Sequence, residues 1–307
     1  MIRDFLRRRS KGGGQTFEMP PQLRQLDEHW TDDRNFPDSF GGAAEYARKM
    51  ARHPLSFFVQ RLHNLGLRGH RILDAGCGTG TWSFGMRGYF DEVYGADYVG
   101  ERTDLARHIA STWGLGGTDF REANVQELPY EDNFFDAVFC FGVIIVPQTS
   151  VESSIREFKR VVRPGGSIYL CLNARGWAHY LASSNDDGRR NLGLDGIYMA
   201  ICKQFRAGRA QADEVVEEIR TYCGEEYVER FRAEQYSPRG RTYPNTYEPD
   251  EVEAVARDQG LERFRWSHEG GLREVSDPVD VSPLYAPSFE GRTSVWECLM
   301  ELPAAQS

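Results

Sequence analysis

The sequence lacks any apolar run near the roughly 20 residues that a membrane-spanning helix needs, so we expect no membrane span. Residues 1–14 carry several charges but are not followed by an apolar segment, which argues against a secretory signal. We expect this stretch to form a disordered basic tail and the chain to be cytoplasmic.

Pairs of cysteines at metal-binding spacing are also missing. The chain has six cysteines, and none of them forms a C-x-x-C pair, so we expect no metal site. Cys140, Cys171 and Cys298 lie inside apolar, strand-like runs, where cysteine acts as a small buried hydrophobic residue. This usage fits a reducing, cytoplasmic compartment.

The chain has fewer basic than acidic residues. The chain has 37 Lys and Arg residues against 46 Asp and Glu residues, a formal net charge of −9. Proteins that bind phosphate backbones are usually basic where they touch them, so this balance argues against a nucleic-acid substrate. We expect a small-molecule substrate, and the sequence leaves the oligomeric state open, a homodimer included.

Hydrophobic periodicity divides the first half of the chain into two parts. In residues 15–70 the apolar residues recur at helical intervals up to Gly66, which predicts an N-terminal helical cap region. Residues 71–173 then alternate between strand-like and helix-like segments. The alternation predicts a doubly wound, mostly parallel α/β sheet, with strands at 71–75, 92–97, 118–123, 135–143 and 167–172, and helices at 79–87, 101–113 and 151–162.

The second half of the chain interrupts this alternation and then completes it. Residues 174–247 contain no clear strand, and a structureless stretch of that length is improbable in a compact domain, so we predict a mainly helical insertion that forms a lid. Residues 248–307 begin with a helix and end with two strands at 261–267 and 293–302. Because no helix separates these two strands, the predicted Rossmann-like sheet has seven strands and an antiparallel edge strand.

A glycine-rich turn follows the first predicted strand. The pattern Gly76-x-Gly78-x-Gly80 lies between a strand and a helix, which is typical of nucleotide-binding sites. Position 81 is Thr, where the dinucleotide fingerprint G-x-G-x-x-G requires its third glycine. Asp74, just before the turn, would repel a pyrophosphate but suits a ligand with an ammonium group. Asp97, at the end of the second predicted strand, can accept hydrogen bonds from both ribose hydroxyls.

Four stretches of the chain together carry a resemblance to a known family. Residues 72–80 (ILDAGCGTG), 93–97 (VYGAD), 123–136 (ANVQELPYEDNFFD) and 156–166 (REFKRVVRPGG) follow one another in the family's order. They resemble the motifs of class I S-adenosylmethionine-dependent methyltransferases. The resemblance implies that residues 71–173 form the cofactor-binding core, with S-adenosylmethionine as cofactor and S-adenosylhomocysteine as product.

The resemblance also implies which residues contact the cofactor. Asn124 stands where the family often has an aspartate, and its carbonyl oxygen can still accept a bond from the adenine amino group. Tyr46 would close over the methionine end. The full set of predicted contacts is Tyr46, Asp74, Gly76, Cys77, Gly78, Gly80, Asp97, Tyr98, Asn124, Val125 and Phe141.

The predicted reaction is methyl transfer by in-line displacement at a site beyond the carboxyl ends of the first and fourth strands, under the insertion. The fourth strand ends without the Asn/Asp-Pro-Pro-Tyr/Phe signature of many amino-group methyltransferases that act on DNA or protein. This favours O- or N-methylation of a metabolite, natural product or sugar. His179 is our candidate general base, and a surface or packing role for it stays open.

Two other functions stay open at this point. One is an NAD(P)-dependent oxidoreductase, because dinucleotide-binding domains share a glycine-rich turn between a strand and a helix. The other is a non-catalytic relative that binds the cofactor only to support a partner. Binding of S-adenosylmethionine would distinguish a methyltransferase from an oxidoreductase. Methyl transfer to a substrate would distinguish a methyltransferase from a non-catalytic relative.

Overall fold

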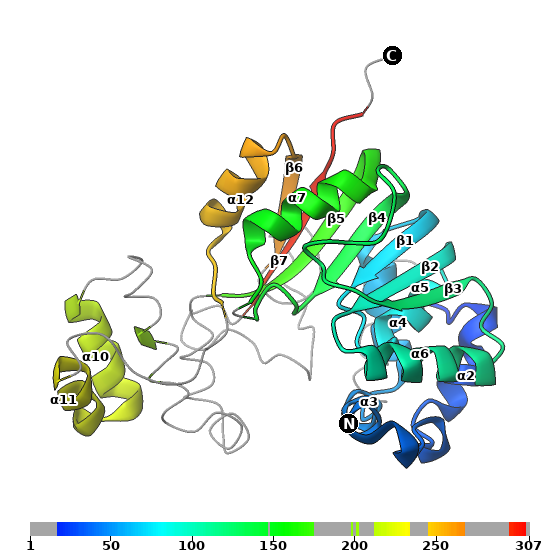
Figure 1. Cartoon of the computed structure of the whole chain (residues 1–307), viewed down its shortest axis with the longest axis horizontal. Coiled ribbons are helices and arrows are strands. Elements are labelled where there is room, and N and C mark those ends of the chain that lie inside the picture. Colours follow the sequence, from blue (N-terminus) through cyan, green and yellow to red (C-terminus); the bar gives the residue numbers. More distant parts are fainter. Residues whose placement is uncertain are drawn as a thin grey trace.

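The strands of the chain form one seven-stranded sheet in the order β3-β2-β1-β4-β5-β7-β6 (Figure 1). The computed structural model describes residues 17–146, 148–174, 198, 201–202, 212–233, 245–267 and 295–304. Along the chain the strands are β1 (Gly69–Ala75), β2 (Phe90–Asp97), β3 (Thr118–Glu122), β4 (Phe135–Phe141), β5 (Val162–Asn173), β6 (Glu262–Ser267) and β7 (Val295–Glu301).

Helices cover both faces of this sheet (Figure 1). Helices α7 and α12 share a core cluster with one face, and α4, α5 and α6 pack with the N-terminal region against the other. The helices are α2 (Arg24–His29), α3 (Gly41–Met50), α4 (Leu55–Leu65), α5 (Thr81–Met86), α6 (Gly100–Thr112), α7 (Val151–Val161), α10 (Ala212–Cys223), α11 (Glu225–Ala233) and α12 (Pro249–Asp258), with 3₁₀ turns η1 (Pro21–Leu23), η2 (Asp33–Asn35) and η3 (Asp38–Phe40).

Local capping explains where several helices begin and end. The Ser150 hydroxyl accepts a hydrogen bond from the backbone N–H of Ser153 and so caps the start of α7. Glu248 and Glu251 form a capping box at the start of α12. Helix α4 ends at Gly66, which takes the left-handed conformation, as the sequence predicts.

The order of the strands reverses between β1 and β4. From β1 the chain runs outward through β2 to β3, and it then returns to the other side of β1 with β4 and β5. A reversal of this kind leaves a crevice at the carboxyl ends of the two central strands, because their connections leave in opposite directions. The predicted doubly wound sheet is confirmed, and its switch point lies at the predicted site.

The antiparallel member of the sheet is β7. It pairs with β5 on one side and with β6 on the other, and it runs antiparallel to both. The sequence predicts an antiparallel strand at this side of the sheet, because no helix separates the last two predicted strands. The pairing order puts β7 between β5 and β6, so the outermost strand β6 runs parallel to the central strands.

Several predicted boundaries shift for identifiable reasons. Strand β4 ends at Phe141, two residues earlier than predicted, because Gly142 has φ +69° and cannot continue a strand. Helix α5 begins at Thr81 rather than residue 79, since Gly80 has φ +87° and acts as its cap. Strand β5 begins at Val162, and residues 163–166 form an irregularity in its pairing with β4 instead of a free turn.

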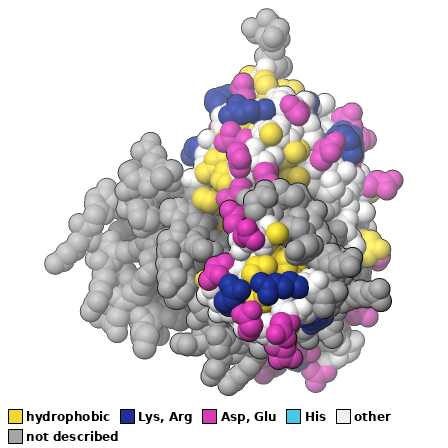
Figure 2. All heavy atoms as spheres, turned by 90° about the vertical axis from the view of Figure 1, so that its left-hand side faces the viewer, with side chains coloured by type: hydrophobic (Ala, Val, Ile, Leu, Met, Phe, Trp, Pro, Cys, Tyr) yellow, Lys and Arg dark blue, Asp and Glu magenta, His cyan; other side chains and the backbone are white. Residues whose placement is uncertain are grey.

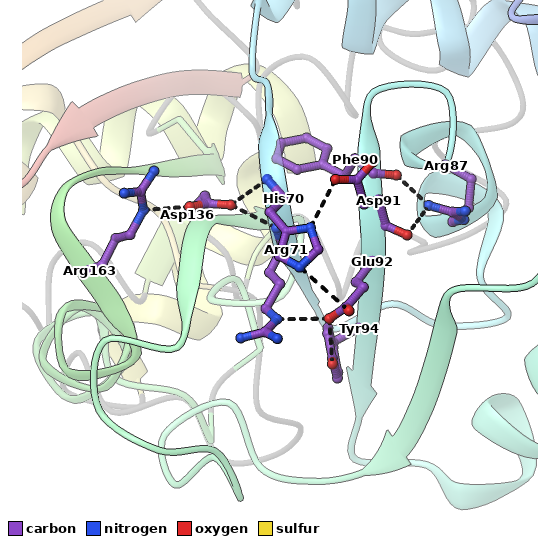
Figure 3. Close-up of polar contacts among 9 residues, drawn as sticks. All are labelled: His70, Arg71, Arg87, Phe90, Asp91, Glu92, Tyr94, Asp136 and Arg163. Atoms are coloured by element: carbon purple, nitrogen blue, oxygen red, sulfur yellow. Dashed lines mark hydrogen bonds and ion pairs between the residues drawn. The ribbon is translucent and has the colours of Figure 1, made fainter.

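Charged side chains join the amino ends of the central strands, at the edge opposite the glycine-rich turn (Figure 3). The Asp136 carboxylate accepts hydrogen bonds from the backbone N–H groups of His70 and Arg71, at 2.5 and 2.7 Å, and pairs with the Arg163 guanidinium. Gly69 must lack a side chain, because a Cβ there would lie 2.7 Å from Asp136 Oδ2. These contacts hold β1, β4 and β5 in register.

The described part of residues 174–247 contains helices α10 and α11, which pack on each other around a separate hydrophobic cluster (Figure 1). The predicted division of the chain into a tail, a cap region, a core, an insertion and a C-terminal part stays a prediction, and residues 1–14 lie outside the described residues. On the face drawn in Figure 2, acidic and basic side chains are interspersed. No helix in the described ranges is both long and apolar enough to cross a membrane.

Candidate functional site

The glycine-rich turn after β1 is bound tightly to β2. The backbone N–H groups of Gly76 and Cys77 both donate to the Ala96 carbonyl, at 2.6 and 2.9 Å. Gly76 has φ +86°, and a Cβ on it would lie 2.0 Å from Val143 Cγ2. Glycine is therefore required at position 76 both by the backbone conformation and by the close approach of the loop that follows β4.

Asp97, at the end of β2, holds the turn from the other side. Its Oδ2 accepts from the Gly78 N–H at 2.9 Å, and its Oδ1 accepts from the Val99 N–H at 2.9 Å. The carboxylate is only 6% exposed, and a guanidinium nitrogen of Arg102 lies 3.7 Å from Oδ1. Its orientation is thus set by the protein before any ligand arrives, while each oxygen keeps a further lone pair.

A cavity of about 620 Å³ opens at the carboxyl ends of β1, β2 and β4. This is the switch point of the sheet and the place where ligands bind in open α/β folds. Its walls come from α3, from the ends of the three strands and from the loops after β3 and β4. The lining residues are Tyr46, Gly76, Asp97, Tyr98, Val99, Arg102, Ala123, Asn124, Val125, Gln126, Phe141, Gly142, Val143, Val146, Gln148 and Thr149.

The structure brings together at this cavity most of the residues predicted to bind the cofactor. Those that line it are Tyr46, Gly76, Asp97, Tyr98, Asn124, Val125 and Phe141. Cys77, Gly78 and Gly80 lie in the turn but do not line the cavity, and Asp74 is buried and does not line it either. His179, the predicted base, lies outside the described residues. The assigned roles stay predictions.

Asp74 is buried, with 1% of its surface exposed. Its Oδ2 accepts a hydrogen bond of 2.5 Å from the Ser83 hydroxyl, which comes from the first turn of α5. Burial raises the pKa of the Asp74 carboxyl from its ordinary value of 3.8 to about 7, despite the opposing hydrogen bond. A second carboxylate therefore supports the turn next to Asp97, inside the protein.

Tyr46 places the N-terminal region over the turn. A Cβ on Gly78 would lie 3.0 Å from Tyr46 Cε1, so the tyrosine ring packs directly on the glycine. The Arg102 guanidinium lies 4.7 Å from the centre of the same ring. Tyr46 and Arg102 together form the rim of the cavity on the side of Asp97.

Residues 72–166 match the family model described as a methyltransferase domain. The matched segment contains the glycine-rich turn, Asp97 and the loops that line the cavity. Residues 72–166 of this chain form a methyltransferase domain. The resemblance seen in the four sequence motifs is confirmed, and S-adenosylmethionine is the cofactor of such a domain.

Curated relatives of the methyltransferase domain include the demethylmenaquinone methyltransferases of Bacillus mycoides and Geobacillus kaustophilus. The first is 35% identical over 108 residues, which are 34% of this chain and 44% of the relative. The second is 34% identical over 109 residues, which are 34% of this chain and 45% of the relative. The chain thus spans less than half the length of the curated relatives it matches.

Solved structures with a similar fold include two described as S-adenosylmethionine-dependent methyltransferases. The one from Clostridium acetobutylicum has a TM-score of 0.49 and 11% identity, and it covers 81% of this chain and 91% of its own. The one from Methanosarcina mazei has a TM-score of 0.47 and 19% identity, and it covers 79% of this chain and 97% of its own.

The side chain of Asn124 in the methyltransferase domain forms a hydrogen bond within its own loop. Its Oδ1 accepts a hydrogen bond of 3.0 Å from the backbone N–H of Gln126, which forms an Asx turn at the cavity. An amide oxygen has a second lone pair, so a bond from the adenine amino group remains geometrically compatible.

The sequence-based list of contacts omits several residues that line the cavity. Arg102 lies in the first turn of α6, and Gln126 follows the predicted adenine contacts Asn124 and Val125. Val99 and Ala123 follow β2 and β3, and the others belong to the loop after β4: Gly142, Val143, Val146, Gln148 and Thr149. The carboxyl end of β4 is predictable as a ligand-facing edge, but the path of the loop beyond it is not, because it depends on what the loop packs against.

Proposed function

We propose that this chain transfers the methyl group of S-adenosylmethionine to a small-molecule acceptor held next to the cavity. The observation that carries the proposal is the Asp97 carboxylate, whose orientation is set by two backbone N–H groups at the edge of the cavity. A carboxylate with one free lone pair on each oxygen is suited to the two hydroxyls of a ribose.

The residues around the turn fit S-adenosylmethionine better than a dinucleotide. Asp74 and Asp97 put two carboxyl groups beside the glycines, and Asp97 affects the pKa of Asp74 through charge repulsion. A pyrophosphate would add negative charge at this place, whereas an ammonium and a sulfonium would offset the charge that is already there. This arrangement favours the methyltransferase over the oxidoreductase.

Bound S-adenosylmethionine supplies a methyl group on a good leaving group, so the protein contributes alignment and exclusion of water. Phe141, Val143 and Val146 form an apolar wall where the cavity continues past β4. Asp97 and the turn would hold one end of the cofactor, and these apolar side chains would border the reacting centre. A base is needed for a hydroxyl acceptor, and His179 is our candidate for that role.

The acceptor is proposed to be a metabolite, natural product or sugar rather than a nucleic acid. The name of the curated relatives states a small-molecule acceptor, demethylmenaquinone. The net charge of −9 also disfavours a phosphate backbone. We further propose that residues 15–70 cap the cofactor, that residues 174–247 hold the acceptor as a lid, and that the chain works in the cytoplasm, since all six cysteines are free thiols.

Titration calorimetry of the purified chain with S-adenosylhomocysteine, S-adenosylmethionine and NAD(P)H tests the cofactor. We expect binding of the first two and none of the third, and the opposite pattern would overturn the proposal in favour of an oxidoreductase. A panel of small molecules incubated with methyl-labelled S-adenosylmethionine then tests turnover. Binding without transfer to any member of a broad panel would favour the non-catalytic relative.

A further inference from the structure

The loop that joins β4 to α7 forms one complete side of the cavity. Val143, Val146, Gln148 and Thr149 all come from this loop. On the side of β3 it is held by the Gln126 amide, whose Oε1 accepts from Ser150 N–H at 2.8 Å and whose Nε2 donates to the Gln148 carbonyl at 3.2 Å. We call residues 142–146 and 148–150 of this loop the cavity wall.

A single residue from the far end of the insertion holds the other side of the cavity wall. The Asn245 backbone N–H donates to the Ile145 carbonyl at 2.6 Å. Its side-chain Nδ2 lies 2.9 Å from the Val146 carbonyl, 3.0 Å from the Thr149 carbonyl and 3.3 Å from the Ile144 carbonyl. The two N–H donors of this one amide group are therefore satisfied by three backbone carbonyls of the wall.

The segment around Asn245 is itself anchored to the sheet. The Tyr247 N–H donates to the Asn173 carbonyl at 2.9 Å, and Ala174 and Tyr247 form an isolated parallel bridge. The Tyr247 hydroxyl donates to the Ile144 carbonyl at 3.3 Å. The chain therefore leaves the core at the end of β5 and returns beside the same point, in contact with the cavity wall.

We propose that Asn245 is a positioning residue for cofactor binding, through which the returning end of the insertion keeps the cavity wall in its binding-competent position. This inference rests on the proposed function, because it takes the cavity as the cofactor site. The wall is a loop, and without Asn245 it samples other positions. The apparent affinity of the cofactor then falls in proportion to the fraction of molecules with the wall in place.

The test compares Asn245→Ala with a matched control, Gln259→Ala. Like Asn245, Gln259 is partly buried, and its side-chain amide donates to a backbone carbonyl about a hundred residues earlier in the chain, that of Glu152, at 3.1 Å. It follows α12 and does not line the cavity. Titration calorimetry with S-adenosylhomocysteine measures affinity, and hydrogen exchange of the peptide containing residues 142–150 measures the order of the wall.

We expect Asn245→Ala to weaken binding of S-adenosylhomocysteine about 10-fold and to speed exchange in the wall, while Gln259→Ala lowers the melting temperature without either effect. Unchanged affinity of folded Asn245→Ala, or equal losses in both variants, would overturn the inference. If Asn245→Ala does not fold, Tyr247→Phe removes one bond to the wall, and a loss of about 2- to 5-fold is expected against no change. Failure of the wild-type chain to bind would instead overturn the proposed function.

Discussion

Replacing Asp74 by asparagine removes a buried charge and little else. Asparagine has nearly the same shape, and its carbonyl oxygen can accept the hydrogen bond that the Ser83 hydroxyl now donates to Asp74 Oδ2. The carboxyl is 1% exposed, and burial raises its pKa to about 7. The substitution therefore tests whether the protein pays a free-energy cost to keep an ionised carboxylate under the glycine-rich turn.

The magnitude follows from the displaced pKa. Because the pKa of Asp74 is about 7 in the folded protein and 3.8 ordinarily, its contribution to the free energy of unfolding is complete below about pH 4 and is lost as the pH rises towards 7. One pKa unit corresponds to about 1.4 kcal/mol, so the full loss is about 4 kcal/mol. Between about pH 5 and about pH 8 the loss is about 2.5 kcal/mol.

Urea unfolding of the cofactor-free wild type and Asp74→Asn at these two pH values measures this loss. The difference in unfolding free energy between the two proteins cancels the other titrating groups. We expect the unfolding free energy of the variant, relative to that of the wild type, to rise by about 2.5 kcal/mol from the lower to the higher pH. A difference that does not change with pH would refute the reasoning. The same variant should bind S-adenosylhomocysteine more weakly, because a carboxylate attracts the ligand's ammonium group.

Three further variants test other parts of the structure. Asp97→Ala should weaken S-adenosylhomocysteine by about 1–3 kcal/mol in calorimetry, and unchanged affinity would remove Asp97 from the site. Gly76→Ala should abolish cofactor binding and lower the unfolding free energy in urea by at least about 1 kcal/mol, since φ is +86° and the added Cβ would meet Val143 of the cavity wall. The control Gly42→Ala, with open space around its Cβ, should be neutral or stabilising. Arg61→Met should lower the unfolding free energy by about 3–5 kcal/mol, because the buried Glu297 carboxylate, 2.9 Å from the Arg61 guanidinium in the wild type, loses its counter-ion. A loss below about 1 kcal/mol would contradict this.

The amino-acid sequence by itself determined the class of the fold and the place of the cofactor. Strand and helix periodicities, glycines that must take positive φ, and acidic residues at strand ends are local properties that are visible in a short window. For this reason the order of β1 to β5, the turn at Gly76 and the position of Asp97 could be predicted. Among the boundaries that shifted, a glycine ended β4, a glycine capped the start of α5, and a pairing irregularity extended β5.

Only the tertiary structure decided which groups share a surface with that turn. Asp74 lies near the end of β1 as predicted, but its burial and its pKa depend on the helix α5 that packs against it. The cavity wall is held by Asn245, which is about a hundred residues further along the chain than the carbonyls it binds. Such contacts arise because chain topology brings the end of an insertion back to the switch point of the sheet, and no local pattern in the sequence records that return.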